Sequence, residues 1–234
     1  GLEWGLVGIA FSFVISQYVG ITFFICITWS VPEVQRSREV LPFFPFHREA
    51  FSPQGIVEYV QLGFPGMVMM CSEWWAYESL TLMASLIGPE AVAVQTLIFQ
   101  LAKLGFTIPS CLSMATGSLV GNAIGASLTN LAVQTGKLCL CAVVSIESAV
   151  VVPALLFGGV HFIELYTSDP IVISTSRSVI PIIAAAAFAD GVKAVCSGIM
   201  RGTGNQKIGA MTNLMSFYVV GLPLAWVFCF HLDL

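Results

Sequence analysis

The sequence predicts an all-α, polytopic transmembrane helix bundle of about six spans. Hydrophobic types make up 57% of the 234 residues and charged types only 9%, whereas soluble domains carry about 25% charged residues. Nine Lys and Arg and thirteen Asp and Glu residues are too few to cover a globule in water. The apolar runs are continuous rather than alternating, which favours helices over a β-barrel. This composition excludes a soluble enzyme, a disordered chain and a nucleic-acid-binding protein.

Six apolar stretches are long enough to cross a bilayer, since a spanning helix needs about 20 residues. They cover roughly 5–29, 61–87, 91–118, 134–158, 172–199 and 209–230. The connection 30–54 contains four prolines, which exclude a single helix there, and 54–62 is expected to form a short amphipathic lead-in to the second span. The seven cysteines have no CxxC spacing, which indicates small buried hydrophobes rather than disulfides or metal ligands. Neither a metal site nor a cofactor is predicted.

The distribution of Lys and Arg predicts the orientation. Basic residues occur in the connections 30–54 and 200–208. The segment 119–133 contains none, but Lys137 follows it closely, whereas the turn 88–90 and the segment 159–171 contain none. By the positive-inside rule, both ends of the chain lie outside, and the cytoplasmic connections are 30–54, 119–133 and 200–208. Arg177, near the outer end of the fifth span, is the exception, and its long side chain is expected to snorkel outward.

Charged side chains inside a span cost about 2.5–3.5 kcal/mol each on insertion scales, so every one is a candidate for function. Glu73 is the strongest candidate because it lies near the middle of the second span beside Trp74 and Tyr77. A carboxylate in a poorly hydrated pocket can carry a proton near neutral pH, or it can pair with a cation that the aromatic rings also attract. The alternative is a structural carboxylate that is hydrogen-bonded to a neighbouring helix.

Two further acids have open interpretations. Tyr77 shares the helix face of Glu73, whereas Glu78 is turned about 140° away, so Glu78 is either a secondary site residue or a packing carboxylate. Asp190 and Lys193 are three residues apart and can touch along one helix. They form either a self-neutralised pair or a pair that opens when Asp190 takes a proton.

The remaining charges inside the spans are weaker candidates. Lys103 is placed to pair with Glu73 or Glu78 across helices. Glu147 is interpreted as structural, because no polar cluster surrounds it in the sequence. The GxxxG spacings from Gly117 to Gly121 and from Gly121 to Gly125 indicate close helix packing. Prolines at 65, 109 and 181 predict bends, either as hinges or as static kinks.

Three spaced motifs resemble those of eukaryotic multidrug and toxic compound extrusion (MATE) transporters. Residues 73–78 (EWWAYE) resemble the seventh helix of that family, and 120–126 (VGNAIGA) resemble the segment after its eighth helix. Residues 200–210 (MRGTGNQKIGA) resemble the segment before its eleventh helix, and Gly221-Leu222-Pro223 matches a G-x-P within that helix. The resemblance covers about 55–230, while 5–29 fits the sixth helix by position and hydropathy.

The resemblance implies a fold of two six-helix lobes, of which this chain is most of one. Residues 1–29 are then the last helix of the N-lobe, 30–54 the cytoplasmic linker between lobes, and 55–234 the seventh to eleventh helices in the C-lobe. The first five helices and the twelfth are absent, so we expect the chain to be part of a longer product whose N-lobe helices are partners. Leu119 stands where the family has an arginine, and Gln100 stands where some relatives carry an acid.

The resemblance also implies a function. It predicts a non-enzymatic multidrug antiporter that exports organic cations or amphipathic solutes, xenobiotics among them, in exchange for protons, with sodium the less favoured ion. The partners are then the solute, the proton and the lipid bilayer of a plasma, vacuolar or other organellar membrane, and not a nucleic acid. The family's seventh-helix glutamate and tenth-helix acid fall on Glu73 and Asp190. The predicted substrate- and proton-binding residues are Glu73, Trp74, Tyr77, Glu78, Gln100, Asp190 and Lys193.

Two other functions remain as alternatives. A flippase of lipid-linked intermediates on a related two-lobed fold is expected to have a more basic cavity for anionic headgroups, and the acids argue against it. A membrane scaffold without transport is expected to tolerate loss of the buried acids.

The alternating basic residues predict the sidedness of two connections. A reporter tag inserted at position 45 should be cytoplasmic, and one at position 165 should be external, because only the first connection is rich in arginine. Accessibility to an impermeant label measures this directly. Finding both tags on one side of the membrane contradicts the six-span topology.

Overall fold

A computed structural model describes residues 5–30 and 52–231, and every regular element in these ranges is a helix. The chain divides into two compact units, residues 1–56 and 57–234. In the first unit, α1 (Gly5–Ser30) is one helix of 26 residues. Most of the predicted linker 30–54 lies outside the described residues.

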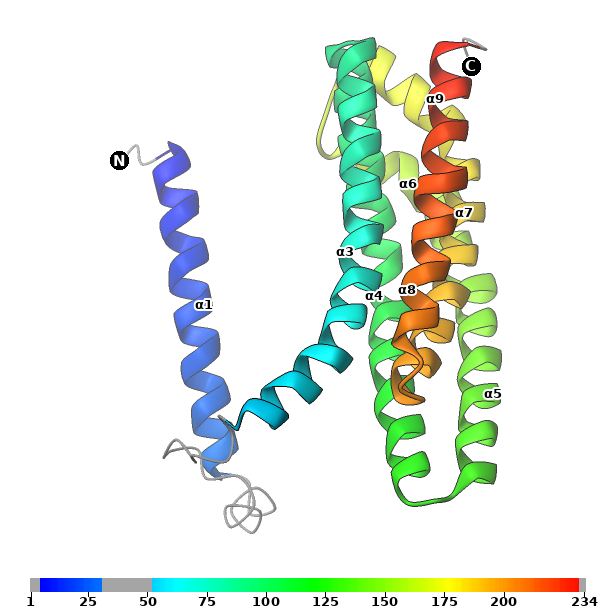
Figure 1. Ribbon diagram of the computed structural model, residues 1–234. Coiled ribbons are helices and arrows are strands. Elements are labelled where there is room, and N and C mark those ends of the chain that lie inside the picture. The colour runs from blue at the N-terminus through cyan, green and yellow to red at the C-terminus, as the bar shows by residue number, and fades with distance from the viewer. Residues whose placement is uncertain (1–4, 31–51, 232–234) are drawn as a thin grey trace. The chain divides into compact units, whose positions relative to one another are not determined.

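The second unit contains the other helices, apart from the first residues of α3. In chain order these are α3 (Pro53–Ile87), α4 (Pro89–Gly125), α5 (Thr129–Ile146), the π-helical η3 (Glu147–Val151), α6 (Val152–Glu164), α7 (Pro170–Gly202), α8 (Gln206–Leu214), the π-helical η4 (Met215–Gly221) and α9 (Leu222–Phe230) (Figure 1). Each predicted span corresponds to one helix or to one continuous run of helical segments, so the predicted helical fold is confirmed. Residues 54–62, the expected lead-in to the second span, form the N-terminal part of α3, which is continuous from Pro53, a residue that tolerates the first helical position.

Local sequence explains where the helices end. Gly88 has a φ of 153° and separates α3 from α4, which begins at Pro89. The Asp169 side chain accepts a hydrogen bond from the Ile171 amide at 2.9 Å and caps the start of α7. After α7, Gly204 adopts a φ of 73°, which favours glycine because it lacks Cβ.

Helix α3 is bent, and its N-terminal part leans away from the axis of the rest (Figure 1). It spans 35 residues and contains Pro65 in its first half. Proline removes one backbone hydrogen bond and its ring clashes with the preceding turn, so it is the expected cause of a bend.

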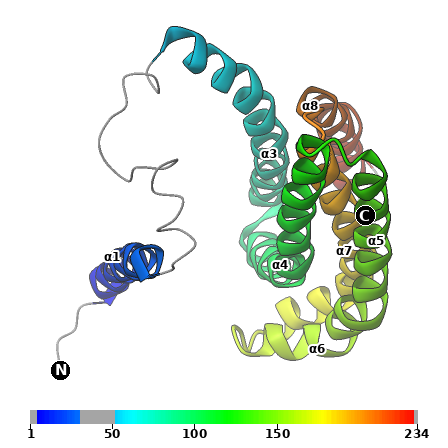
Figure 2. The ribbon, with the colours of Figure 1, turned by 90° about the horizontal axis from the view of Figure 1, so that it is seen from below.

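Helices α4 and α7 pack most closely, through glycines on both. A Cβ added to Gly117 would lie 3.2 Å from the Gly198 carbonyl oxygen, and one on Gly202 would lie 2.6 Å from that of Gly117. The same geometry holds between Gly121 and Gly202, at 3.4 Å. The GxxxG interpretation is therefore confirmed, since small residues let two backbones approach. Helix α5 runs beside this pair, against both α4 and α7 (Figures 1 and 2).

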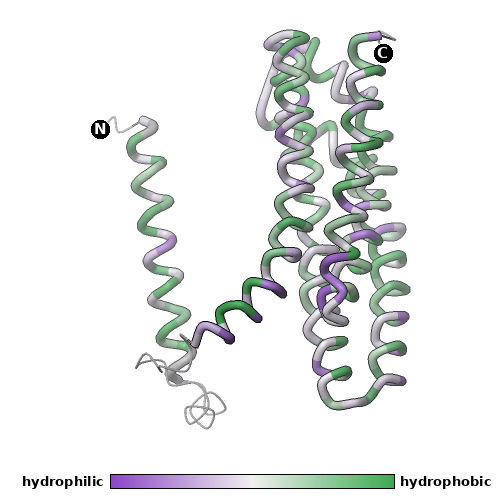
Figure 3. The backbone as a smooth tube through the Cα atoms, in the orientation of Figure 1, coloured by the Kyte–Doolittle hydropathy of each residue, from purple (hydrophilic) through white to green (hydrophobic). Residues whose placement is uncertain are grey.

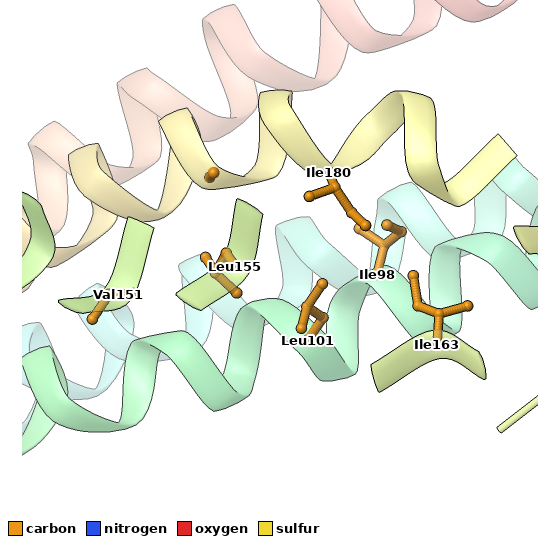
Figure 4. Packing of buried hydrophobic residues seen from close by; sticks show 7 residues of the cluster. Ile98, Leu101, Val151, Leu155, Ile163 and Ile180 are labelled. Carbon is orange, nitrogen blue, oxygen red and sulfur yellow. The ribbon is translucent and has the colours of Figure 1, made fainter. Parts of the chain in front are cut away.

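The apolar core lies between α4, α6 and α7, at the end that is distant from these glycines. Its buried residues are Ile98 and Leu101 from α4, Val151 from η3, Leu155 and Ile163 from α6, and Ile180 and Ala184 from α7 (Figure 4). The labelled side chains of α4, α6 and α7 point toward one another. Burial of this kind fixes the positions of α4 and α7, which supply side chains to the candidate site.

The outer surface of the second unit is apolar, as a lipid-facing surface must be. Leu138 and Phe157 are 69% and 81% exposed, and most other exposed large residues are also apolar. The polar turn between α7 and α8 contrasts with the mostly apolar helices (Figure 3). Five helical segments in the described residues are long and apolar enough to cross a membrane, and the bent α3, with its three acids, is outside that set. The chain is an integral multi-pass membrane protein.

Gly198→Ala should destabilise the α4–α7 contact. The new methyl group would meet the Ser113 backbone carbonyl, with its carbon at 3.1 Å, and overpacking of this kind costs about 1–3 kcal/mol. The control is Gly158→Ala on α6, where a methyl group meets no heavy atom within 4 Å in the described part of the chain and helix propensity improves by up to about 1 kcal/mol. Thermal unfolding in detergent should show a lower Tm for Gly198→Ala and an equal or higher Tm for the control. Equal Tm values for both variants would contradict this packing.

Candidate functional site

A cavity of about 430 Å³ lies between α3, α4 and α7, with one residue from α8. This volume is within the range of small-molecule sites, about 300–1,000 Å³. Its polar lining residues are Glu73, Tyr77, Lys103, Thr107, Ser110, Ser113, Asp190, Ser197, Arg201 and Asn213. Its apolar lining residues are Met69, Met70, Trp74, Phe99, Ala102, Phe106, Met114 and Ala194.

The centre of the site is an ammonium group shared by two carboxylates. The Lys193 Nζ lies 2.8 Å from Glu73 Oε1 and 3.0 Å from Asp190 Oδ1. The Tyr77 hydroxyl donates a hydrogen bond of 2.7 Å to Asp190 Oδ2. The three charged side chains are only 20–29% exposed, so the ionic contacts are partly shielded from water. We call Glu73, Asp190 and Lys193 the charged triad.

Helical spacing explains how two helices build this triad. Glu73 and Tyr77 are four residues apart on α3, and Asp190 and Lys193 are three apart on α7. Both spacings place side chains on one helix face. The two faces oppose each other, so each α7 side chain has a partner on α3.

Aromatic rings surround the triad. The Tyr77 ring lies 5.2 Å from that of Phe99 and 6.2 Å from that of Phe217, between their centroids. The Lys193 ammonium lies 4.6 Å from the Phe217 ring. This distance allows a cation–π contact, so the Phe217 ring stabilises the Lys193 ammonium in addition to the two acids.

A second cation lies over aromatic rings. The Lys103 Nζ is 4.2 Å from the Phe99 ring centroid and 5.3 Å from that of Trp74. The expected pairing of Lys103 with Glu73 or Glu78 is wrong, since the described residues show no ion pair for Lys103. Spacing along one helix gives no information about contacts between helices. It therefore could not show that Lys193 on α7, rather than Lys103 on α4, pairs with Glu73.

Among the cavity residues that were missed in the sequence, three make hydrogen bonds between helices. The Arg201 guanidinium donates to Ser113 Oγ at 2.8 Å, and Ser113 Oγ donates to the Ala194 carbonyl oxygen. The Asn213 side chain donates to the Met69 carbonyl oxygen at 2.8 Å. A hydroxyl or amide inside an apolar span was the available signal, but such groups also bond within their own helix.

The structure brings most of the predicted site residues together. Glu73, Trp74, Tyr77 and Asp190 line the cavity, and Lys193 bonds to two of them. Glu78 and Gln100 are exposed on other faces and are not among the lining residues. The basic neighbour of Glu73 comes from another helix, since Lys193 of α7 is in contact with it. The roles of these residues in binding remain predictions.

Comparison with known proteins shows the family of the chain. The MatE family model matches residues 65–227, a range that contains the cavity and the charged triad.

The chain belongs to the MatE family. Multidrug and toxin extrusion protein 1 of mouse is 36% identical over 172 residues, which are 73% of this chain and 30% of the mouse protein. Multidrug and toxin extrusion protein 2 of mouse is 32% identical over 225 residues, 95% of this chain and 38% of that protein. An uncharacterized transporter of Schizosaccharomyces pombe is 32% identical over 191 residues, 80% of this chain and 34% of that protein. The resemblance noted in the sequence is therefore confirmed.

A solved structure shows the same fold. The eukaryotic MATE transporter AtDTX14 matches with a TM-score of 0.78 at 25% identity, over 94% of this chain and 48% of that chain. The MatE chain therefore spans about a third of the length of the curated relatives named above and about half of this structure.

The charged triad predicts a pattern of stability. Glu73→Gln or Asp190→Asn alone leaves Lys193 one carboxylate, whereas the double variant leaves its charge partly buried and unpaired. Breaking a buried pair costs about 3–5 kcal/mol, and the partial exposure here reduces that figure. The double variant should therefore lose more stability than the sum of the two single changes. Adding Lys193→Gln should restore much of it.

Thermal unfolding in detergent, on the two single, the double and the triple variant, measures this pattern. If the triple variant is no more stable than the double, the ammonium does not depend on these carboxylates.

Proposed function

We propose that this chain supplies the proton- and solute-binding lobe of a proton-coupled antiporter that exports organic cations or amphipathic solutes. The observation that carries the proposal is the charged triad in an apolar, aromatic-lined cavity between membrane-spanning helices. Ionisable groups persist inside spans where they contact a transported ion or substrate. The names of the curated relatives, multidrug and toxin extrusion proteins, support the same proposal.

The charge of the triad suits a one-for-one exchange. With both carboxylates ionised and Lys193 protonated, the triad carries one net negative charge. One proton or one monovalent organic cation neutralises it, and both together leave an excess of positive charge in a poorly hydrated site. Proton and cation therefore exclude each other electrostatically. Because an ammonium group already lies between the carboxylates, a sodium ion has fewer free oxygen ligands, which favours the proton.

The proton acts in this mechanism by loosening α7 from α3. When Glu73 or Asp190 takes a proton, Lys193 loses one of its two ionic partners. The contact between the two helices weakens, and a bend in α3 near Pro65 gives that helix freedom to move. A ligand shifts such an equilibrium by its different affinity for the two conformations. In this proposal, the second lobe of the transport path is formed by helices other than those described for this chain.

A second candidate function is transfer of an anionic amphiphile. It is favoured by Lys103 and Arg201, which line the cavity and form no ion pair within the described residues. Counted together with the triad, these two side chains make the cavity positive by one charge. Uptake of a lipophilic cation and of a matched lipophilic anion into proteoliposomes distinguishes the two functions. Export of the anion alone would favour the second.

Glu73→Gln should abolish proton-driven exchange of an organic cation in a complete transporter that carries this segment. The change removes the negative charge that alternately binds proton and cation, and it leaves Lys193 paired with Asp190. The assay is cation uptake into proteoliposomes under an imposed pH gradient. The matched control is Glu78→Gln, five residues along the same helix, because Glu78 is exposed and does not line the cavity.

The control should transport at close to the parental rate. Parental transport by Glu73→Gln with unchanged pH dependence would show that Glu73 is structural and would refute the mechanism. Equal loss in both variants would show that α3 cannot tolerate either change, whichever face it lies on.

A further inference from the structure

Glu147 is a further acid inside a predicted span, and it does not line the cavity. Glu147 is 0% exposed, and neither of its carboxyl oxygens has a hydrogen-bond partner among the described residues. It is the first residue of η3, the π-helical segment that joins α5 to α6. Such π-helical turns inside α-helices occur frequently at functional sites, and they leave backbone bonding that can rearrange. Glu147 therefore combines an unusual backbone with an unsatisfied buried acid.

Gly191 on α7 makes room for this side chain. A Cβ at Gly191 would lie 2.7 Å from Glu147 Cδ and 2.9 Å from Glu147 Cγ. Any other residue at 191 would displace the carboxyl group. Gly191 directly follows Asp190, and successive helical residues point about 100° apart. One turn of α7 thus faces the cavity through Asp190 and faces Glu147 through Gly191.

No nearby cation is free to pair with Glu147 in the described part of the chain. On α7, Asp190 and Lys193 flank Gly191, and Lys193 is already bonded to Glu73 and Asp190. The other titratable groups on α5, α6 and α7 lie ten or more residues from Glu147 or Gly191 along the chain or are thiols: Lys137, Cys139 and Cys141 on α5, His161 and Glu164 on α6, and Arg177, Cys196 and Arg201 on α7. Helix α4, whose Gly105 lies against Val151 of η3, adds Glu90, Lys103 and Cys111. No cation among the described residues forms an ion pair with Glu147.

We propose that Glu147 is a second proton-binding group of this protein, neutral in the conformation described here and able to release its proton only when η3 shifts and is hydrated. An unpaired carboxylate that is fully buried is very costly, so the acid form is the stable one. On release the carboxyl O–H bond breaks, the proton passes to water, and the carboxylate remains. The proposal rests on the proposed function for its meaning, since it adds a proton site next to the triad.

Infrared difference spectroscopy tests the proposal without any transport assay. The parent protein in lipid nanodiscs at pH 8 should show the carbonyl band of a protonated carboxylic acid, and Glu147→Gln should lack it. The control is Glu164→Gln, an acid that is exposed at the end of α6, which should keep the band. If the parent shows no such band, or if Glu147→Gln retains it, Glu147 is ionised or the proton lies elsewhere, and the proposal fails.

A second variant keeps the test decisive if Glu147→Gln does not fold. Gly191→Ala pushes the carboxyl group from its buried position, so its band should shift or disappear at pH 8. The matched control is Gly158→Ala, where the new methyl group has free space, and it should keep the parental band. An unchanged band in Gly191→Ala would overturn the assignment of the proton to this position.

Transport measurements separate this proposal from the proposed function. In a transporter that still exchanges cation for protons, Glu147→Gln should change the pH dependence of exchange, whereas a merely structural Glu147 would leave the profile unchanged in the folded variant. If the infrared band belongs to Glu147 but the protein exchanges no cation, the proposed function fails and the proton site stands. If cation exchange is intact and the band is absent, the proposed function stands and the proposed proton site at Glu147 fails.

Discussion

The ion pairs of Lys193 are the interaction on which the site depends. Helix α3 does not approach the other helices as closely as α4 approaches α7, and polar side chains make its specific contacts. Lys193 binds Glu73, Tyr77 binds Asp190, and Asn213 binds the backbone of Met69. In a medium of low dielectric constant such contacts are strong when they are complete and costly when one partner is removed. A change in protonation therefore acts on helix position as well as on charge.

Helices α4 and α7 are packed more tightly against each other than α3 is against either of them. The glycines of α4 and α7 bring the two backbones into direct contact, and the core between α4, α6 and α7 is fully buried. Close packing of this kind resists continuous deformation. A rigid α4–α7 pair opposite a bent α3 provides one wall that holds the carboxylate and ammonium of α7, and another that can respond to the charge on Glu73.

Patterns along the chain predicted the helices, the family and much of the site. Continuous apolar runs fixed the helical fold, and the i,i+3 spacing predicted the contact between Asp190 and Lys193. What failed depended on contacts between helices. The sequence allows Lys103 to pair with Glu73 or Glu78 on α3. In the structure its ammonium group lies over the rings of Phe99 and Trp74 instead. Glu147 has an apolar sequence neighbourhood, and only the position of Gly191 on another helix shows how completely its carboxyl group is enclosed.

The central claim is that a proton and an organic cation compete for the one net negative charge of the triad. The measurement that tests it most directly is the affinity of the purified protein for a lipophilic cation such as tetraphenylphosphonium as a function of pH. Competition with a single proton predicts that the apparent Kd rises about tenfold for each unit by which the pH is lowered, in the pH range where the triad is protonated. The same slope should be absent in Glu73→Gln. A Kd that does not change with pH in the parent protein would contradict the account.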